Sequence, residues 1–499
     1  MPRPTPRLVP SRHPTAVGRR AFCAGLAATL FALPSAGRGE EAATDTAPPA
    51  GGPPVAQEPA AAQQDGIRAL RAAPASRPIR PDAPRETALW AYDGSVPGPL
   101  LRVRRGEEVR LRLKNDLPQP TSLHWHGVRL TNAMDGVGGL TQEAVAPGRD
   151  FDIRFTPPDA GTFWYRPLVP AYAAEQTERG LHGLLVVEEE EQPAVARDLA
   201  LILDDWALDG EGQIRESFRD AAELALAGRL GNWLTVNGRQ APEVLPLAPG
   251  GRARLRILNA ANARIFTLRF DGLRVQVVAV DGQPTDPFAP ARGSLSLVPG
   301  GRLDLVVEAP PEAGGKGTIL AALGQGLPLL VVEAEGALSP LAGTPLRALA
   351  GNSLPDAIDL ARATRADLIL EGGLDPKTAN PTAAAASLPD AARVWRINGV
   401  AWADAAARPL VAVKAGTPVV LSLVNRTFFA QALHVHGHHV RLLHPLDDGW
   451  EPYWLDTVPV PAGQTVRIAF VADNPGRWMI GSSILERLTG GLAAWFEVG

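Results

Sequence analysis

The sequence predicts an all-β protein made of three consecutive, homologous β-sandwich domains. One pattern, a tight turn followed by a strand-like run, occurs three times at intervals of about one domain length. The 499 residues suffice for about three domains of ordinary size. The 50 glycines and 48 prolines fit short strands separated by many turns. With 45% hydrophobic and 20% charged residues, the composition is that of a globular protein rather than a disordered or membrane protein.

Residues 1–36 resemble an export signal. Arg19 and Arg20 precede an apolar stretch, and small residues follow it. The paired arginines resemble a twin-arginine (Tat) signal, with a Sec signal as the alternative. Residues 37–66 are rich in alanine and proline and predict a linker. The only cysteine, Cys23, lies in the leader, so the mature chain has neither a disulfide nor a thiolate ligand.

The repeated pattern is a three-residue turn, followed by an alternating apolar and polar run that ends in Asn. Such a run predicts a half-buried strand. The turns and runs are Tyr92-Asp93-Gly94 with 105–115, Val236-Asn237-Gly238 with 249–259, and Ile397-Asn398-Gly399 with 415–425.

The first and third repeats share two further segments, which complete the predicted domain organisation. The segment 155–165 parallels 470–480, and 181–188 corresponds to 492–498. We expect domains at 67–192, 193–340 and 365–499, with a linker at 341–364. Residues 214–230 are the main helical candidate, interpreted as a surface helix inserted in the second domain.

Two His-x-His-Gly sequences occupy equivalent positions in the first and third repeats, beginning at His124 and His434. Residues two apart on a strand point to the same face, so each pair directs two imidazoles to one side. If the two domains face each other, four imidazoles converge, which suits copper or zinc. The candidate metal ligands are therefore His124, His126, His434 and His436. A purely structural role is the alternative.

These motifs resemble those of the multicopper oxidase family. The segment 123–127, followed by Met134-Asp135-Gly136 and Thr141-Gln142, is similar to the first copper motif, and 433–438 is similar to the third. The resemblance spans residues 67–499. It implies three cupredoxin-like Greek-key β-sandwich domains, a trinuclear copper cluster between the first and third, and a blue copper in the third.

The sequence departs from the family pattern at most other ligand positions. The second motif has Arg166-Pro167-Leu168 after Trp164-Tyr165, where the family has two histidines. The expected histidine before His434 is Gln431. In the fourth motif the ligand positions hold Gly481, Ser482, Ser483, Arg487 and Leu492.

These departures remove most of the chemistry that the resemblance implies. A blue copper site relies on a thiolate and two imidazoles, and none of the three is present. Of the six histidines of the paired coppers, only His126 and His436 remain. We therefore expect typical multicopper oxidase activity to be absent.

Two outcomes stay open for the four remaining histidines. The resemblance implies that His124 and His434 are ligands of a type 2 copper, which His126 or His436 can assist. One copper ion can then bind. Alternatively, Arg166 fills the former cluster and repels a divalent ion, so that no copper binds and the histidines form a polar seam. Asp135 with Gly136 is interpreted as only a turn.

Three functions remain. The sequence favours an exported, non-oxidase scaffold or interaction protein of the periplasm, which resembles the copper-free SufI-type proteins and contacts periplasmic or envelope proteins. The alternatives are a copper-binding protein and a copper-dependent oxidoreductase that uses the residual site. A net charge of -4 argues against nucleic acid as a partner, and we expect no transmembrane segment in the mature chain.

Overall fold

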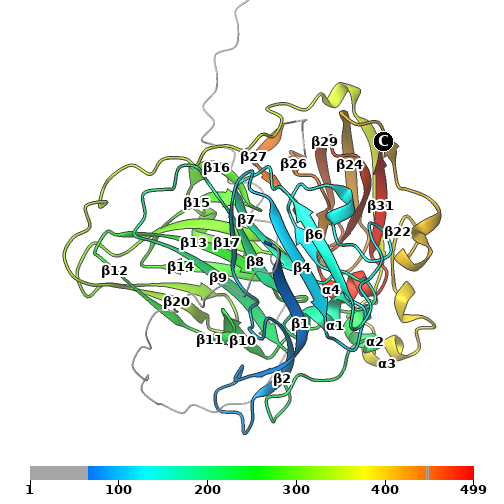
Figure 1. The fold of residues 1–499 in the computed structure, drawn as a ribbon, viewed down its shortest axis with the longest axis horizontal. Coiled ribbons are helices and arrows are strands. Elements are labelled where there is room, and N and C mark those ends of the chain that lie inside the picture. Colours follow the sequence, from blue (N-terminus) through cyan, green and yellow to red (C-terminus); the bar gives the residue numbers. More distant parts are fainter. Residues whose placement is uncertain (1–65, 446, 448) are drawn as a thin grey trace, which may run out of the picture. The chain divides into compact units, whose positions relative to one another are not determined.

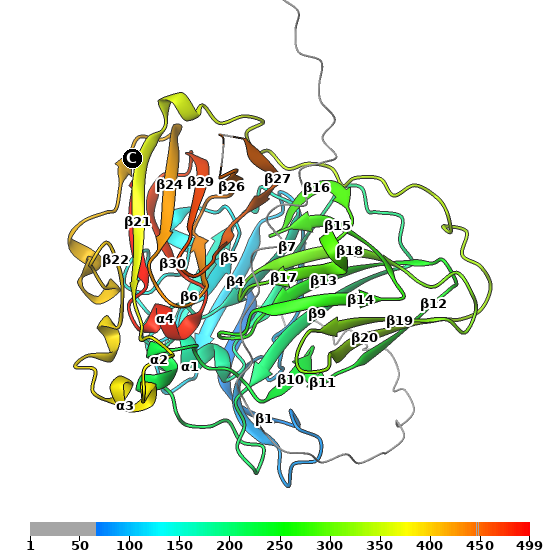
Figure 2. The same cartoon turned by 180° about the vertical axis from the view of Figure 1, so that it is seen from behind.

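The computed structural model describes residues 66–445, 447 and 449–499. The predicted leader 1–36 and the linker 37–66, except for its last residue, lie outside the described residues. Within them, strands form six sheets, which confirms the predicted all-β class (Figure 1 and Figure 2). No helix in this part of the chain has the length and apolar character needed to cross a membrane.

Domain 1 consists of two four-stranded sheets, with the orders β2-β1-β4-β6 and β3-β8-β7-β5. A short helix, α1 (Ala173–Glu178), and the 3-10 turn η1 (Asn132–Met134) accompany them. The strands are β1 (Arg68–Arg77), β2 (Thr87–Tyr92), β3 (Leu101–Arg104), β4 (Val109–Asn115), β5 (His124–His126), β6 (Asp150–Phe155), β7 (Gly161–Arg166) and β8 (Gly183–Glu188).

Domain 2 has a seven-stranded sheet, β11-β10-β9-β13-β18-β15-β16, and a five-stranded sheet, β12-β20-β19-β14-β17. Its helical elements are α2 (Ala221–Ala225) and η2 (Ala291–Gly293). The strands are β9 (Arg197–Trp206), β10 (Trp233–Val236), β11 (Arg239–Gln240), β12 (Glu243–Leu247), β13 (Arg252–Asn259), β14 (Phe266–Asp271), β15 (Arg274–Val280), β16 (Gln283–Phe288), β17 (Ser294–Leu297), β18 (Arg302–Glu308), β19 (Lys316–Ala321) and β20 (Leu327–Ala334).

Domain 3 has a six-stranded sheet, β22-β21-β24-β29-β26-β27, and a five-stranded sheet, β23-β31-β30-β25-β28. Its strands are β21 (Thr364–Gly372), β22 (Trp395–Ile397), β23 (Ala412–Val413), β24 (Thr417–Asn425), β25 (Gln431–Val435), β26 (Val440–Leu443), β27 (Trp450–Leu455), β28 (Thr457–Val460), β29 (Thr465–Ala472), β30 (Gly476–Ser482) and β31 (Ala493–Val498). The helical elements are η3 (Leu360–Arg362), α3 (Pro381–Ala386), η4 (Ala391–Arg393), η5 (Trp402–Ala407) and α4 (Leu485–Thr489). The domain boundaries given above stay a prediction.

The three sequence repeats form the same structural unit in each domain. Each repeat strand (β4, β13, β24) pairs in parallel with the first strand of its domain. Each turn has two successive residues with positive φ, which a two-residue type I′ hairpin turn requires. These φ values are 49° and 72° at Asp93 and Gly94, 52° and 71° at Asn237 and Gly238, and 52° and 78° at Asn398 and Gly399.

The asparagine that ends each repeat strand is buried and makes the same hydrogen bonds in all three domains. The side-chain Oδ1 of Asn115, Asn259 and Asn425 accepts from the backbone N–H two residues later, at 3.0 Å in each case. Each Nδ2 donates to backbone carbonyls of the loop that follows and of a second segment. One amide thus satisfies several buried backbone groups, which explains why each run ends in Asn.

Burial of the repeat strands differs from the prediction in domain 2. Strand β4 alternates between buried and partly exposed residues, as predicted, whereas every residue of β13 is buried. Arg254 and Arg256 of β13 do not reach solvent, because domain 1 covers them: Arg254 Nη2 lies 2.5 Å from Glu189 Oε1, and Arg256 Nη1 donates to Thr162 Oγ1 at 2.9 Å. The half-buried prediction is therefore wrong for this strand.

The predicted surface helix at 214–230 is also largely wrong. Only α2 is helical, and its preceding residues Arg219 (φ 64°) and Asp220, which caps the helix, are not. A positive φ at an arginine interrupts a helical path. Residues 221–223 of α2 are partly exposed, whereas Leu224 is buried and its carbonyl accepts from Trp395 Nε1 of domain 3 at 2.6 Å.

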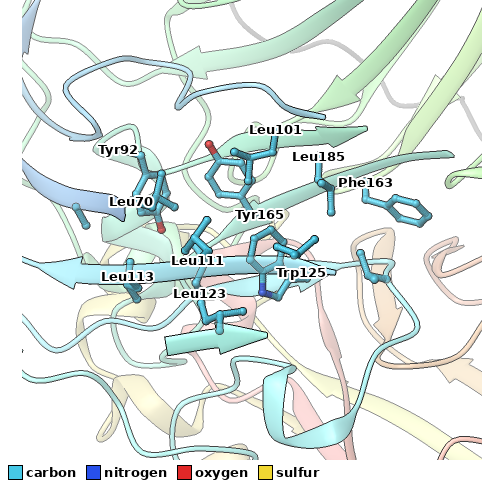
Figure 3. Packing of buried hydrophobic residues seen from close by; sticks show 14 of the residues in the cluster. Leu70, Tyr92, Leu101, Leu111, Leu113, Leu123, Trp125, Phe163, Tyr165 and Leu185 are labelled. Atoms are coloured by element: carbon cyan, nitrogen blue, oxygen red, sulfur yellow. The ribbon is translucent and has the colours of Figure 1, made fainter. Parts of the chain in front are cut away.

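The core of domain 1 fixes the orientation of the first histidine pair. Leucines of one sheet, such as Leu111 and Leu113, face Trp125, Tyr165 and other side chains of the second sheet (Figure 3). The Trp125 ring is fully buried and lies 5.8 Å from that of Tyr165. Because successive side chains of a strand alternate, the neighbours of Trp125 on β5 face away from this core.

Candidate metal centre

The structure brings the four predicted histidines together between domains 1 and 3. Their exposed fractions are at most 2%. The rings of His126 and His434 stack with their centroids 3.6 Å apart, and those of His124 and His436 are 4.3 Å apart. The expected convergence of the two pairs is thus observed, while their role as metal ligands stays a prediction.

The two pairs occupy equivalent strands. In domain 1, β5 pairs with β7 and places His124 opposite Arg166. In domain 3, β25 pairs with β30 and places His434 opposite Gly481. Arg166 and Gly481 therefore occupy matching positions, as the sequence alignment of the second and fourth motifs assumes.

His124 and His434 have the same hydrogen-bonding arrangement. The Nδ1 of His124 lies 2.7 Å from the backbone oxygen of Asp135, and that of His434 lies 3.0 Å from the backbone oxygen of Asp456. Because a carbonyl only accepts, both Nδ1 atoms carry the proton. The Nε2 of each ring is buried and has no hydrogen-bond partner. In a neutral ring it presents a lone pair.

The tautomer of His126 follows from its partner Thr457. The Thr457 hydroxyl lies 2.7 Å from Asp456 Oδ1 and donates its single proton to that carboxylate. Its oxygen therefore accepts from His126 Nε2, at 2.8 Å. The remaining nitrogen, Nδ1, is buried and has no partner. It carries the lone pair, in the reverse arrangement to His124 and His434.

Three imidazoles thus offer free lone pairs in one buried place. One ring nitrogen from each of His124, His126 and His434 lies within 4.8 Å of those of the other two, so that this group could hold a metal ion. Burial lowers the pKa of His124 to about 4 and that of His434 to about 3, so both are neutral at pH 7. Neutral imidazoles are ligands that late first-row divalent metal ions prefer.

His436 is held differently from the other three. Its Nδ1 lies 2.9 Å from Asp135 Oδ2, a carboxylate of domain 1. The interpretation of Asp135 with Gly136 as only a turn is therefore wrong: Gly136 has a φ of 79°, which suits a turn, but Asp135 also binds histidines of both domains. Burial alone would raise the pKa of Asp135, but His436 and His124 hold it well below its usual range.

Arg166 lies on the same sheet face as His124 and is buried, with 2% exposed. Its guanidinium lies 5.2 Å from the Trp164 ring, and Nη1 donates to the neighbouring Pro167 oxygen. Among the described residues no carboxylate forms an ion pair with it, and Nε has no partner. Burial lowers its pKa to about 9, so that it remains a cation at pH 7.

The residues at the expected blue-copper positions also meet. Arg487 Nη1 donates to Gln431 Oε1 at 2.8 Å, and the Ser482 amide donates to the Leu492 oxygen at 2.9 Å. The Arg487 guanidinium lies over the rings of both Trp395 and Phe429, at 5.1 and 5.2 Å from their centroids. These contacts support the sequence register assumed for the fourth motif.

Sequence reasoning missed the residues that support the histidines. Asp456, Thr457 and Arg302 are buried next to the rings of His126 and His434. An isolated acidic or basic residue carries no pattern that reveals a buried role. Only the conflict between a charge and apolar neighbours, as at Asp456 after Trp454 and Leu455, points to one.

Comparisons with known proteins agree with the sequence motifs. Models of the multicopper oxidase family match residues 75–192, 197–336 and 375–499. "Multicopper oxidase MmcO" of Mycobacterium tuberculosis is 31% identical over 498 residues, and the match covers 93% of each chain.

The chain belongs to the multicopper oxidase family.

Solved structures of multicopper oxidases have the same fold. The enzyme of Pseudomonas thermotolerans superposes with a TM-score of 0.75 at 32% identity, covering 87% of this chain and 99% of that one. A "Copper resistance protein A homolog" of Pseudomonas syringae is 28% identical over 273 residues, 46% of this chain and 45% of its own. The predicted family and the three cupredoxin-like β-sandwich domains are thereby confirmed.

Proposed function

We propose that this multicopper oxidase homologue binds a single copper ion and does not reduce dioxygen by four electrons. The observation that carries the proposal is the set of three buried imidazole nitrogens without partners, from His124, His126 and His434. Buried polar atoms without a partner are costly, and a bound cation would satisfy all three. We place water or another small ligand at the fourth position.

The residues do not fit a blue copper. Copper of that type relies on a thiolate and two imidazoles, and the corresponding positions hold Ser482, Gln431 and Arg487. The Arg487 guanidinium is itself a buried cation that donates to Gln431 at 2.8 Å. This cation would repel a metal ion next to it. The Gln431 amide and the Arg487 guanidinium therefore occupy the positions where a blue copper would need its ligands.

The residues also do not fit a pair of coppers. Two ions of that kind need several imidazoles each, whereas the matching positions of β7 and β30 hold Arg166 and Gly481. The nitrogens of three histidines suffice for one ion. His436 pairs with Asp135. We regard it as a neighbour of the single proposed site and not as a ligand of a second one.

The test is to load the purified, full-length protein with Cu(II), dialyse it, and measure metal content, visible absorption and the electron paramagnetic resonance (EPR) spectrum. We expect about one copper per chain with a spectrum of nitrogen ligands. The variant His124→Ala/His434→Ala should lose it. His444→Ala, which removes a half-buried histidine outside the cluster, serves as the matched control.

Three results would contradict the proposal. Wild-type protein that retains no copper would leave the cluster without a metal function. Strong absorption near roughly 600 nm would mean that a thiolate-like copper site exists. Oxidation of a phenol or diamine with four-electron reduction of dioxygen would contradict the proposed loss of oxidase activity.

The second candidate is a copper-free interaction protein of the periplasm, with envelope proteins as partners. The burial of Arg166 without a carboxylate favours it, because a fixed cation near His124 opposes a divalent ion. Both candidates include export by the twin-arginine route. Replacing Arg19 and Arg20 by Lys and following the protein in cell fractions tests that part.

A further inference from the structure

We propose that domain 2 positions two imidazoles of the metal centre, although it contributes no histidine to it. The positioning residue is Arg302, which acts through Asp456 and Thr457 of domain 3. This inference rests on the proposed function, because it assigns a task to the residues that support the proposed ligands.

The chain of contacts begins with an ion pair that is entirely buried. Arg302 Nη1 donates to Asp456 Oδ1 at 2.8 Å, and Nη2 donates to Oδ2. This two-point arrangement fixes the carboxylate in its plane as well as in place. Arg302 is in turn held by the backbone oxygens of Gly300, at 3.0 Å, and Thr162, at 3.3 Å. Domains 1 and 2 together therefore fix the position of the Asp456 carboxylate.

The first branch runs from Asp456 to His126. The carboxylate accepts the Thr457 hydroxyl proton, and the hydroxyl oxygen then has to accept from His126 Nε2. If Asp456 did not take that proton, Thr457 would be free to donate it to the ring instead. The proton of His126 would then move to Nδ1, which is the nitrogen that should bind the metal.

The second branch runs from the backbone of Asp456 to His434. The backbone oxygen of Asp456 accepts from His434 Nδ1 at 3.0 Å and from the Val435 amide at 2.9 Å. It thereby keeps the Nε2 of His434 unprotonated. The same carbonyl aligns the ring with the strand that carries it, so a shift of Asp456 moves both.

Domain 2 also holds the backbone of these residues. Asp281 Oδ2 accepts from the amides of Asp456 and Thr457, at 3.1 and 3.0 Å. Asp281 and Gly282 form the turn between β15 and β16, with φ values of 48° and 79°. Asp281 Oδ1 accepts from the Arg302 amide at 3.0 Å, which joins the turn to β18. One turn and one strand of domain 2 thus hold Asp456 and Thr457 of domain 3 in place through hydrogen bonds.

The competing explanation is that the ion pair between Arg302 and Asp456 only joins the two domains. It would stabilise the fold but would have no effect on the proton of His126. Arg254 provides a matched control, since it is fully buried and lies 2.5 Å from both Glu189 and Asp304. No contact between Arg254 and the four histidines occurs among the described residues. Arg254→Lys should weaken the fold much as Arg302→Lys does, but should leave the metal centre intact.

The experiment compares full-length wild type, Arg302→Lys, Thr457→Val, Thr457→Ser and Arg254→Lys. Cu(II) affinity is measured by competition with a chelator, and EPR reports the ligand set. Loss of such supporting contacts typically lowers metal affinity about 10- to 100-fold, and we expect this for Arg302→Lys and Thr457→Val. Thr457→Ser retains the hydroxyl and should restore the affinity. Arg254→Lys should keep the wild-type value.

A second readout needs no metal. Long-range ¹H–¹⁵N spectra of ¹⁵N-histidine-labelled protein report which ring nitrogen of His126 carries the proton. We expect protonated Nε2 in wild type and Thr457→Ser, and a changed or mixed state in Thr457→Val and Arg302→Lys.

Unchanged affinity and unchanged His126 signals in either Arg302→Lys or Thr457→Val would overturn the inference. An equal loss of affinity in Arg254→Lys would also overturn it, since the effect would then be general loosening. If the wild type binds no copper, the proposed function fails, while the histidine spectra still decide whether Arg302 and Thr457 set the tautomer.

Discussion

Two buried arginines, Arg166 and Arg487, illustrate how individual residues decide the chemistry of this protein. Both are almost fully buried, and burial lowers the pKa of each to about 9. Both remain cations at pH 7, without a carboxylate ion pair among the described residues. Their surroundings differ, because Arg487 donates to Gln431 whereas Arg166 shares a sheet face with His124. Only Arg166 bears on the proposed ion.

We predict that Arg166→Met raises the affinity of the three-histidine site for Cu(II). Methionine keeps the length and packing of the side chain but removes a charge that opposes a divalent ion. A gain of about tenfold corresponds to about 1.4 kcal/mol. Chelator competition measures it. Arg487→Met should leave the affinity unchanged, and an equal gain there would show that the charge of Arg166 has no specific effect.

At this scale the sequence predicts which histidines are the candidate ligands, but not which of their ring nitrogens carries the proton. The spacing of His124 with His126, and of His434 with His436, predicts that each pair points to one side of its strand, because it depends only on the period of a strand. Which nitrogen carries the proton depends on Asp135, Asp456 and Thr457, which are distant in the sequence. Such partners become visible only when the domains are assembled.

Among the secondary-structure elements, the three repeat strands share one feature: each ends in a buried asparagine. In domain 3, Asn425 Nδ2 donates to the oxygens of Phe429 and Val460, and Oδ1 accepts from the Thr427 amide. The loops after β4 and β13 are held by their own asparagines in the same way. The asparagine side chain thereby joins a loop to the strand without the backbone hydrogen bonds of a sheet.

We predict that Asn425→Ala lowers the free energy of unfolding by about 2–4 kcal/mol, since several buried backbone groups lose their partners at once. Denaturant unfolding measures the change. Asn380 is the control, because its side chain caps the exposed helix α3 with one bond of 3.0 Å. Asn380→Ala should cost only about 1 kcal/mol. Similar losses at the two positions would contradict the assigned role of Asn425.

The elements that the sequence predicts well are those with a repeated or strictly alternating pattern. The strands of the three repeats and their turns are found where they are expected. The helix expected at 214–230 shrinks to α2, because the pattern did not show the positive φ of Arg219. The burial of β13 was missed because it depends on domain 1, which a single strand cannot reveal.

Across the whole molecule, the three domains also meet at Glu486 of α4. Its Oε1 accepts from Asn262 of domain 2 at 2.7 Å, and Asn262 also donates to the Ala174 oxygen of domain 1 at 3.0 Å. The second oxygen, Oε2, is buried and has no partner. Burial raises the pKa of Glu486 to about 7, although the Asn262 bond opposes the shift.

We predict that Glu486→Gln stabilises the protein more at pH 8 than at pH 4.5. A raised pKa means that the folded state holds the proton more tightly than the unfolded chain does. The stability from this carboxyl is therefore full below about pH 4.5 and is lost as the pH rises to about 7. Glutamine removes that loss, which amounts to about 1.4 kcal/mol per pH unit at most.

Thermal unfolding of both proteins between pH 4.5 and 8 measures the difference. The control is Glu211→Gln, whose side chain is 67% exposed and should show no such trend. A Glu486→Gln effect that does not depend on pH would mean that the carboxyl has the same pKa in the folded protein as in the unfolded chain.

The contact between His126 and Thr457 spans 331 residues of the chain, and this has a consequence for the order of events during biogenesis. Contacts so distant form late, because the intervening chain has to fold first. A nascent chain without its last domain has His124 and His126, but it lacks the facing rings and the hydroxyl that sets the proton of His126. Under the proposed function, uptake of the ion would therefore mark the completed molecule and distinguish it from every truncated or half-folded form.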